Sequence, residues 1–145
     1  MKYVVIGSQG FLGKAVSDLI SRENRGFLIK IDKAISKDYA GSKNVYNYQV
    51  DLTDSDRLIE ICRSQKVDIV INLAGTIGES SDEKMFELNC FAPIDFVKAA
   101  KGQRFKVVLI GSAAEYGEIP YGVKADETFD LSPVSGYGIS KAAQT

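Results

Sequence analysis

The sequence predicts an α/β fold built on a doubly wound parallel sheet, and two patterns carry that prediction. Short runs rich in Val and Ile alternate with segments whose apolar residues recur every three or four positions. Runs that are apolar at nearly every residue are typical of strands buried on both faces, as in parallel sheets covered by helices. With right-handed crossovers between the strands, the expected strand order is 3-2-1-4-5.

Each element follows from a stretch of this pattern. The strands are expected at residues 3–7, 27–32, 45–51, 67–75 and 105–111. Helical stripes run through Phe11–Ile20, Leu58–Cys62 and Met85–Ala99. Ser80, followed three residues later by Glu83, is the predicted capping box of the third helix. All 145 residues are interpreted as one domain.

A glycine loop, GSQGFLG (7–13), joins the first expected strand to the first helix. Gly7 permits a tight turn, Gly10 lets the backbone approach a pyrophosphate, and Gly13 allows close packing of the helix. The phosphates of a dinucleotide would then lie at the helix N-terminus, where unpaired amides favour negative charge. The alternative is a glycine-rich turn without a ligand, but the position between strand and helix favours the binding site.

Two acidic residues end the next two strands. Asp32 lies at the distance from the loop at which a carboxylate accepts hydrogen bonds from the adenine ribose, and it would repel a 2′-phosphate. This favours NAD over NADP, although the adjacent Lys33 could offset part of the repulsion. Asp51 could accept from the adenine amino group or could cap a helix, but Asp54 and Ser55 are better placed as caps.

Composition excludes several classes of function. The chain has no histidine, which rules out a Ser-His-Asp hydrolase and argues against a catalytic zinc, and no metal site is expected. Its net charge of −1 without a basic block indicates neither a nucleic-acid nor a membrane partner. Cys62 and Cys90 have no metal-ligand spacing and are typical of buried thiols in a reducing compartment, so a cytoplasmic protein is expected.

Five segments together resemble the extended short-chain dehydrogenase/reductase family, in its NAD-dependent epimerase/dehydratase group. They are GSQGFLG (7–13), VDLTD (50–54), NLAG (72–75), GSAAEYG (111–117) and YGISK (137–141), in the order in which the family carries them. The resemblance implies a Rossmann-type domain that binds NAD. It covers only the N-terminal part of such enzymes, so residues 1–145 are expected to end before the substrate lobe.

The resemblance also implies a catalytic set of Ser112, Tyr137 and Lys141. Residues four apart on a helix share one face, and a nearby ammonium lowers the pKa of a phenol. Tyr137 would move the proton of a substrate hydroxyl, Ser112 would hydrogen-bond the same oxygen, and Lys141 would bind the nicotinamide ribose. The expected cofactor contacts are Gly7, Gln9, Gly10, Phe11, Leu12, Gly13, Asp32, Asp51, Leu52, Leu73, Ala74, Gly75, Tyr137 and Lys141.

Asn89 is a further candidate for catalysis. Pro93, four residues later, has no N–H to donate to the Asn89 carbonyl, so that carbonyl could hold a water on the way to Lys141. The alternative is a break in the helix, with Pro93 in the first turn of a new one.

The substrate implied by the resemblance is a nucleotide-diphosphate sugar. Ala113 and Ala114 stand where dehydratases of the group carry acidic residues, which favours an epimerase or a 4-keto-sugar reductase. Because the helix bearing Lys141 is cut short, we expect its last turn to fray and the 145-residue chain to be an inactive fragment. A non-catalytic NAD-binding module is the alternative, and a homodimer is left open.

Overall fold

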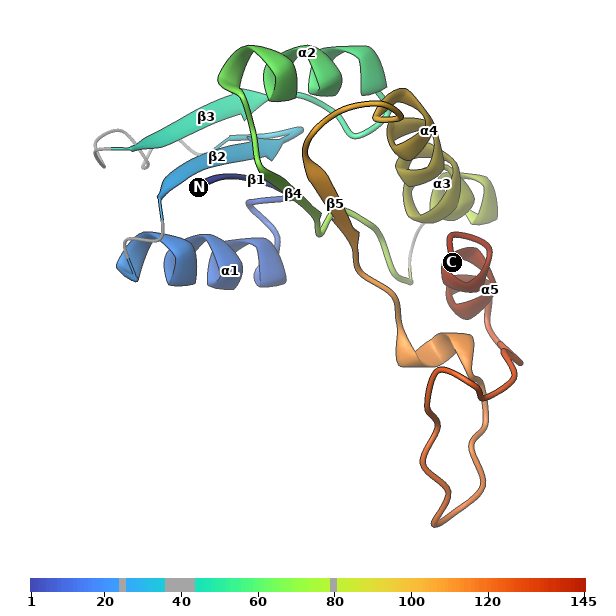
Figure 1. Cartoon of the computed structure of the whole chain (residues 1–145). Helices are drawn as coiled ribbons and strands as arrows, with labels where there is room; N and C mark the ends of the chain where they lie inside the picture. The colour runs from blue at the N-terminus through green and yellow to red at the C-terminus, as the bar shows by residue number, and fades with distance from the viewer. Residues whose placement is uncertain (24–25, 36–43, 79–80) are drawn as a thin grey trace.

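The computed structural model describes residues 1–23, 26–35, 44–78 and 81–145 of the chain. Five strands and a series of helices alternate along it (Figure 1). The strands are β1 (Lys2–Ile6), β2 (Phe27–Asp32), β3 (Val45–Gln49), β4 (Ile69–Asn72) and β5 (Lys106–Leu109). The helices are α1 (Phe11–Arg22), α2 (Ser55–Gln65), α3 (Asp82–Phe86), η2 (Glu87–Phe91), α4 (Ala92–Ala99), η3 (Ala113–Glu115) and α5 (Gly136–Ala142).

The strands form one sheet in the order β3-β2-β1-β4-β5, with every neighbouring pair parallel. This confirms the predicted fold class and strand order. Most strands are shorter than expected. For example, β4 already ends at Asn72 and β5 at Leu109. The residues that follow leave the sheet and form the loops at its carboxyl edge, which is where ligands bind in sheets of this type.

The two faces of the sheet are covered unequally, as Figure 1 shows. Helices α2 and α4 lie over one face, where the larger core contains Ile6, Ile31, Leu58 and Phe96, none of them more than 1% exposed. Helix α1 lies over the other face, where Ile20 packs with a smaller set of strand residues. The larger core therefore fixes the β1–β4 part of the sheet, at whose ends the candidate site lies.

The N-terminus of α3 differs from the prediction. Ser81 is the N-cap, and its hydroxyl accepts a hydrogen bond from the Lys84 amide at 3.3 Å. The predicted capping box of Ser80 and Glu83 is therefore wrong by one residue, and Ser80 itself lies outside the described residues. Ser81 has the extended backbone angles that an N-cap residue takes.

The third helix does not break at Pro93. Its segments α3, η2 and α4 follow one another without a gap, and η2 is a π-helical turn in which the Ala92 N–H donates to the Glu87 carbonyl. Pro93 lies in the first turn of α4. In the wider π-turn, an N–H donates to a carbonyl five residues earlier instead of four. This change of hydrogen-bond partners lets the helix continue through Pro93 without a break.

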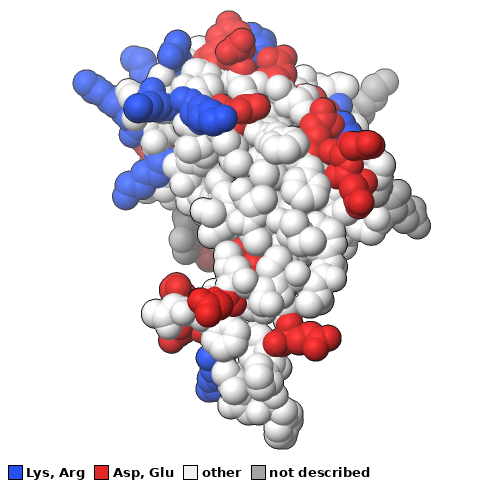
Figure 2. All heavy atoms as spheres, turned by 90° about the vertical axis from the view of Figure 1, so that its right-hand side faces the viewer, with Lys and Arg blue, Asp and Glu red and all other residues white. Residues whose placement is uncertain are grey.

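The face that carries α3, α4 and α5 has a broad central area in which few charged atoms are visible (Figure 2). Acidic and basic residues gather at one end of this face and around the long loop at the other end. Ile139 of α5 and Phe91 of η2 are exposed by 45% and 57%.

Candidate functional site

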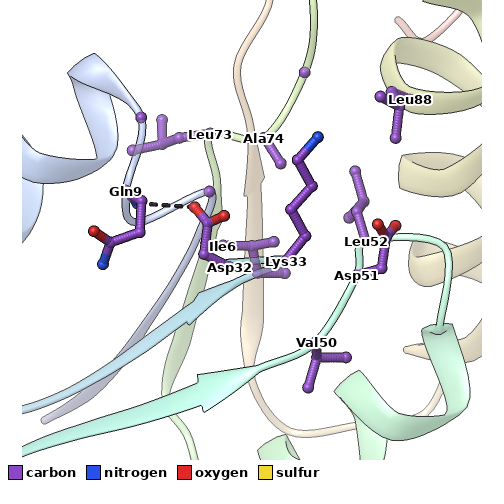
Figure 3. Close-up of a pocket in the computed structure, with 13 residues that line it drawn as sticks. Ile6, Gln9, Asp32, Lys33, Val50, Asp51, Leu52, Leu73, Ala74 and Leu88 are labelled. Atoms are coloured by element: carbon purple, nitrogen blue, oxygen red, sulfur yellow. Dashed lines mark hydrogen bonds between the residues drawn. The ribbon is translucent and has the colours of Figure 1, made fainter. Parts of the chain in front are cut away.

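The glycine loop is held by the carboxyl end of β2. The amides of Gly7 and Ser8 both donate to the Ile31 carbonyl, at 2.9 and 3.1 Å. The Gln9 amide donates to the Asp32 carboxylate at 2.8 Å, as Figure 3 shows. The loop is thus fixed by backbone and carboxylate contacts before any ligand binds.

The three glycines of this loop have different surroundings. Gly7 has a positive φ of 77°, and a Cβ there would lie 2.6 Å from the Ala74 nitrogen. A Cβ on Gly13 would lie 2.0 Å from the Gly7 carbonyl oxygen, whereas one on Gly10 would meet only that oxygen, at 3.3 Å. Gly7 and Gly13 are therefore required by the protein itself. Gly10 leaves space on the ligand side, and this fits a cradle for a pyrophosphate.

A first cleft of about 330 Å³ opens beside this loop, at the ends of β1, β2 and β4. Figure 3 shows Lys33 rising across it, with Asp32 on one side and Leu52 on the other. Asp51 lies on the far wall, where hydrogen bonds from the amide and hydroxyl of Thr53 lower the pKa of its carboxyl group. The cleft is lined by Ile6, Gly7, Gln9, Gly10, Asp32, Lys33, Val50, Asp51, Leu52, Leu73, Ala74, Gly75 and Leu88.

A second cleft of about 190 Å³ adjoins the first. Both clefts are lined by Leu73, Ala74 and Gly75, which follow β4. The second cleft also contains Tyr137 and Lys141 from α5. Its other lining residues are Leu12, Asn72, Thr76, Ile77, Asn89, Ile110 and Gly111.

Lys141 is buried, with 8% of its surface exposed, and its ammonium group donates to the Gln144 side chain at 2.6 Å. Burial lowers the pKa of this ammonium group, while the charge of Glu115 and the thiol of Cys90 act to raise it. The expectation that Lys141 would be poorly fixed is wrong. The residues after α5 fold back on it, since the Gln144 and Thr145 amides both donate to the Lys141 carbonyl.

Asn89 is buried between two parts of the site. Its side-chain carbonyl accepts from the Thr76 amide at 2.8 Å, and its amide group donates to the Thr76 carbonyl and to the Ser140 hydroxyl. Ser140 in turn donates to the Tyr137 carbonyl. The side chain therefore joins the loop after β4 to the helix that carries Tyr137 and Lys141. The role predicted for the Asn89 backbone carbonyl stays a prediction.

Ser112 lies next to the second cleft rather than among the residues that line it. Its hydroxyl accepts from the Ala114 amide as the N-cap of η3, at 3.2 Å, and its own amide donates to the Glu115 carboxylate. It lines another hollow, with Gln144 and Thr145, although its neighbour Gly111 belongs to the cleft.

The structure brings most of the predicted cofactor contacts together. Twelve of the fourteen residues named from the sequence line the first cleft, the second, or both, and Leu12, Tyr137 and Lys141 belong to the second alone. Two of them do not line either cleft: Phe11, which is 89% exposed, and Gly13, which packs inside the loop. Sequence reasoning missed the apolar wall residues Val50 and Leu88, because a single apolar residue at a strand end or on a helix carries no signal of its own.

Within the described ranges, no helix is long and apolar enough to cross a membrane. The same part of the chain has no cluster of three or more His, Cys, Asp or Glu residues that could hold a metal ion.

Comparison with known proteins identifies the family. The family model for the NAD dependent epimerase/dehydratase family matches residues 3–145. The chain is 26% identical to a dTDP-6-deoxy-L-talose 4-dehydrogenase (NAD(P)(+)) of Kitasatospora kifunensis, over 99% of this chain and 45% of that protein. It is 30% identical to a UDP-glucose 4-epimerase of Lactobacillus helveticus, over 97% of this chain and 44% of that protein.

The fold is also that of solved enzymes. The crystal structure of dTDP-glucose 4,6-dehydratase from Bacillus anthracis in complex with NAD matches with a TM-score of 0.88 and 19% identity, over 99% of this chain and 48% of that one. The chain spans about half the length of the curated relatives it matches. Because the family model covers nearly all of its residues, the chain belongs to the NAD dependent epimerase/dehydratase family.

Proposed function

We propose that this chain is the NAD-binding part of a nucleotide-sugar epimerase or 4-keto-sugar reductase that acts by hydride transfer. The observation that carries the proposal is the meeting of two clefts. The cleft beside the glycine loop and the cleft that contains Tyr137 and Lys141 share Leu73, Ala74 and Gly75. A dinucleotide with its phosphates on the glycine loop could therefore extend past the end of β4 into the second cleft.

The residues of the first cleft suit the adenosine and pyrophosphate parts of NAD. The first amides of α1 have no partner within the helix, and Gly10 leaves them accessible. A carboxylate has about four acceptor positions, so Asp32 can accept from a ribose hydroxyl while it holds the Gln9 amide. Asp51 and Leu52 would line the adenine end.

The residues of the second cleft suit acid–base chemistry on an alcohol. The nicotinamide, when bound, accepts or returns the hydride. Tyr137 takes the proton of the hydroxyl that is oxidised, or returns it to the oxygen of the ketone that is reduced. Lys141, one turn later on α5, lines the same cleft and contributes a positive charge to it. Ser112 would hydrogen-bond the same oxygen after its hydroxyl turns away from the Ala114 amide.

NAD is proposed over NADP on the strength of Asp32, whose carboxylate faces the first cleft. Lys33 also faces this cleft, so its ammonium group could pair with a 2′-phosphate. The name of the relative from Kitasatospora kifunensis includes NAD(P)(+), which stands for NAD and NADP. Nucleotide-diphosphate sugars are proposed as substrates because the two curated relatives are named for such sugars. A cytoplasmic location is proposed from the two free buried thiols, Cys62 and Cys90.

A second candidate, a module that binds NAD without turning over a substrate, is favoured by one observation. The Ser112 hydroxyl caps η3 instead of lining the cleft. The chain also spans less than half of each curated relative. We propose that the 145 residues alone bind NAD and do not turn over a sugar nucleotide.

Calorimetric titration of the chain with NAD and NADP tests the proposal. We expect NAD to bind, NADP to bind more weakly, and Gly10→Ala to weaken NAD binding by about tenfold, because its Cβ would occupy the ligand side of the loop. Ser21→Ala, at the exposed far end of α1, is the control and should bind as the unaltered chain does. Absence of NAD binding by the folded chain would contradict both candidates, and tighter binding of NADP would contradict the role of Asp32.

Turnover tests whether the 145 residues alone are active. Incubation of the chain with NAD and UDP-glucose, followed by chromatography of the sugar nucleotides, should give no epimer. Epimer formation that Tyr137→Phe abolishes would instead show that these residues suffice for catalysis.

A further inference from the structure

Glu115 is a buried carboxylate to which the proposed chemistry gives no task. It ends η3, and only 5% of its surface is exposed. Acidic side chains are rarely buried to this extent unless they have hydrogen-bond or charge partners. Its partners therefore indicate what the carboxylate does.

The first set of partners is the backbone after β5. One oxygen of Glu115 accepts from the Ser112 amide at 2.5 Å, while the Ser112 hydroxyl accepts from the Ala114 amide. The two residues form a reciprocal capping box around η3. A Cβ on Gly111 would lie 3.0 Å from the same carboxylate oxygen, so the carboxylate packs directly against the end of the strand. Glu115 thereby fixes the segment that carries Ser112.

The second set of partners is the end of α5. The other oxygen of Glu115 accepts from the Thr145 hydroxyl at 3.0 Å, and that hydroxyl also contacts the Lys141 carbonyl. Gln144, which accepts from the Lys141 ammonium group, lines the same hollow as Glu115. The carboxylate thus contacts the turn that holds Lys141 in place.

Charge connects Glu115 to Lys141 as well. Among the described residues, the titratable groups around Lys141 are Glu115 from η3, Cys90 from η2 and Tyr137 from one turn earlier on α5. Burial raises the pKa of the Cys90 thiol, which is therefore uncharged at neutral pH. Glu115 is left as the anion that offsets the cost of burying the Lys141 ammonium group.

We propose that Glu115 is a positioning residue of the candidate site, which fixes the Ser112 backbone with one oxygen and supports a charged Lys141 at the end of α5. The proposal depends on the proposed function only in the roles given there to Ser112 and Lys141. A single side chain then couples the strand end that carries the serine to the helix that carries the lysine. Neither Ser112 nor Lys141 would be correctly placed if this carboxylate were lost.

The test uses two variants that separate the two tasks. Glu115→Gln keeps a carbonyl oxygen for the Ser112 amide and removes the charge. Glu115→Asp keeps the charge on a chain too short to reach the same amide. Glu118→Gln, an exposed carboxylate three residues away, is the matched control.

The charge is followed by NMR titration of the Lys141 side chain in the folded, cofactor-free chain, with the resonance assigned through Lys141→Arg. We expect Glu115→Gln to move the Lys141 titration to lower pH, because the anion that favours the ammonium form is gone. Glu118→Gln and Glu115→Asp should leave it close to that of the unaltered chain. A Glu115→Gln shift no larger than the Glu118→Gln shift, or an equal shift in Glu115→Asp, would overturn the electrostatic part.

The backbone contact is followed by hydrogen exchange of the Ser112 amide. Exchange of the Ser112 amide should accelerate more in Glu115→Asp than in Glu115→Gln. Equal exchange rates in the two variants would overturn the proposed contact of Glu115 with the Ser112 backbone. If Glu115→Gln does not fold, the Glu115→Asp exchange rate, compared with that of Glu118→Asp, still decides it. Both measurements are made without NAD or sugar nucleotide, so their outcome is independent of whether the chain binds NAD.

Discussion

The two clefts are built in different ways. The glycine loop of the first cleft depends on backbone geometry within the first third of the chain, where the end of β2 holds the loop and Gly7 and Gly13 have no room for a side chain. The second depends on side chains far apart in sequence, such as Asn89 and Ser140, which meet at 3.1 Å across 51 positions. A local motif therefore specifies the proposed nucleotide site, whereas tertiary packing assembles the proposed reaction site.

The difference has a consequence for stability. A Cβ added at Gly7 or Gly13, in the loop of the first cleft, would collide with backbone atoms. Loss of a polar side chain in the second cleft leaves buried partners without hydrogen bonds. The first cleft should therefore be most sensitive to added volume, and the second to lost hydrogen bonds and charge.

The largest effect is expected from Gly13→Ala. Its Cβ would lie 2.0 Å from the Gly7 carbonyl oxygen, so α1 or the loop must shift, and we expect the free energy of unfolding to fall by about 3 kcal/mol. Gly10→Ala, with its nearest contact at 3.3 Å, is the matched control and should cost less than about 1 kcal/mol. Urea unfolding measures both. Equal losses would show that the loop adapts to either side chain.

The second effect concerns Asn89. Asn89→Ala removes three hydrogen bonds and leaves the Thr76 amide without this acceptor, so we expect a loss of about 2–3 kcal/mol in the free energy of unfolding. Asn47→Ala, at an exposed position of β3, is the control and should change it by less than about 0.5 kcal/mol. A loss for Asn89→Ala as small as that of the control would mean that the second cleft does not depend on this side chain.

The first cleft was largely predictable from sequence because its determinants are local. Gly7, Gly10 and Asp32 follow strands that the apolar runs reveal, and the spacing of the loop sets its geometry. Even so, Phe11 was assigned to the cofactor site and is exposed, since a spacing motif does not say which way a side chain points.

The second cleft was predictable only in part. Tyr137 and Lys141 were found through their i, i+4 spacing, and both line the cleft. The side-chain role of Asn89 was missed because its partners, Thr76 and Ser140, are distant in sequence. The capping of η3 by Ser112 depends on a buried Glu115, and burial of that residue cannot be read from a loop sequence.

A smaller effect is expected when the charge of Asp32 is removed. Asp32→Asn keeps an oxygen for the Gln9 amide but would replace the proposed charge-assisted hydrogen bond to ribose by a neutral one. We expect NAD binding to weaken by about tenfold, or 1.4 kcal/mol, and NADP binding to weaken less, since repulsion of the 2′-phosphate is relieved. Calorimetric titration measures both. An unchanged ratio of the two affinities would contradict cofactor selection by this carboxylate.

The smallest effect is a pH dependence of stability that originates in the second cleft. Burial lowers the pKa of Lys141 in the folded chain below its ordinary value of 10.5, which the unfolded chain retains. Between those two pKa values the unfolded state binds more protons than the folded state, so this group makes stability rise with pH across that window. Below the window both states are protonated, and the cost of burying the charge is present in full.

Lys141→Met isolates this contribution because it keeps much of the side-chain length without the charge. The difference in unfolding free energy, unaltered chain minus variant, should rise as pH increases through the alkaline range up to about 10.5. Urea unfolding at a series of pH values measures it, and other titrating groups cancel in the difference. A difference that stays flat would show that the ammonium group of Lys141 is as well stabilised inside the protein as in water, and burial would then not lower the pKa of this group.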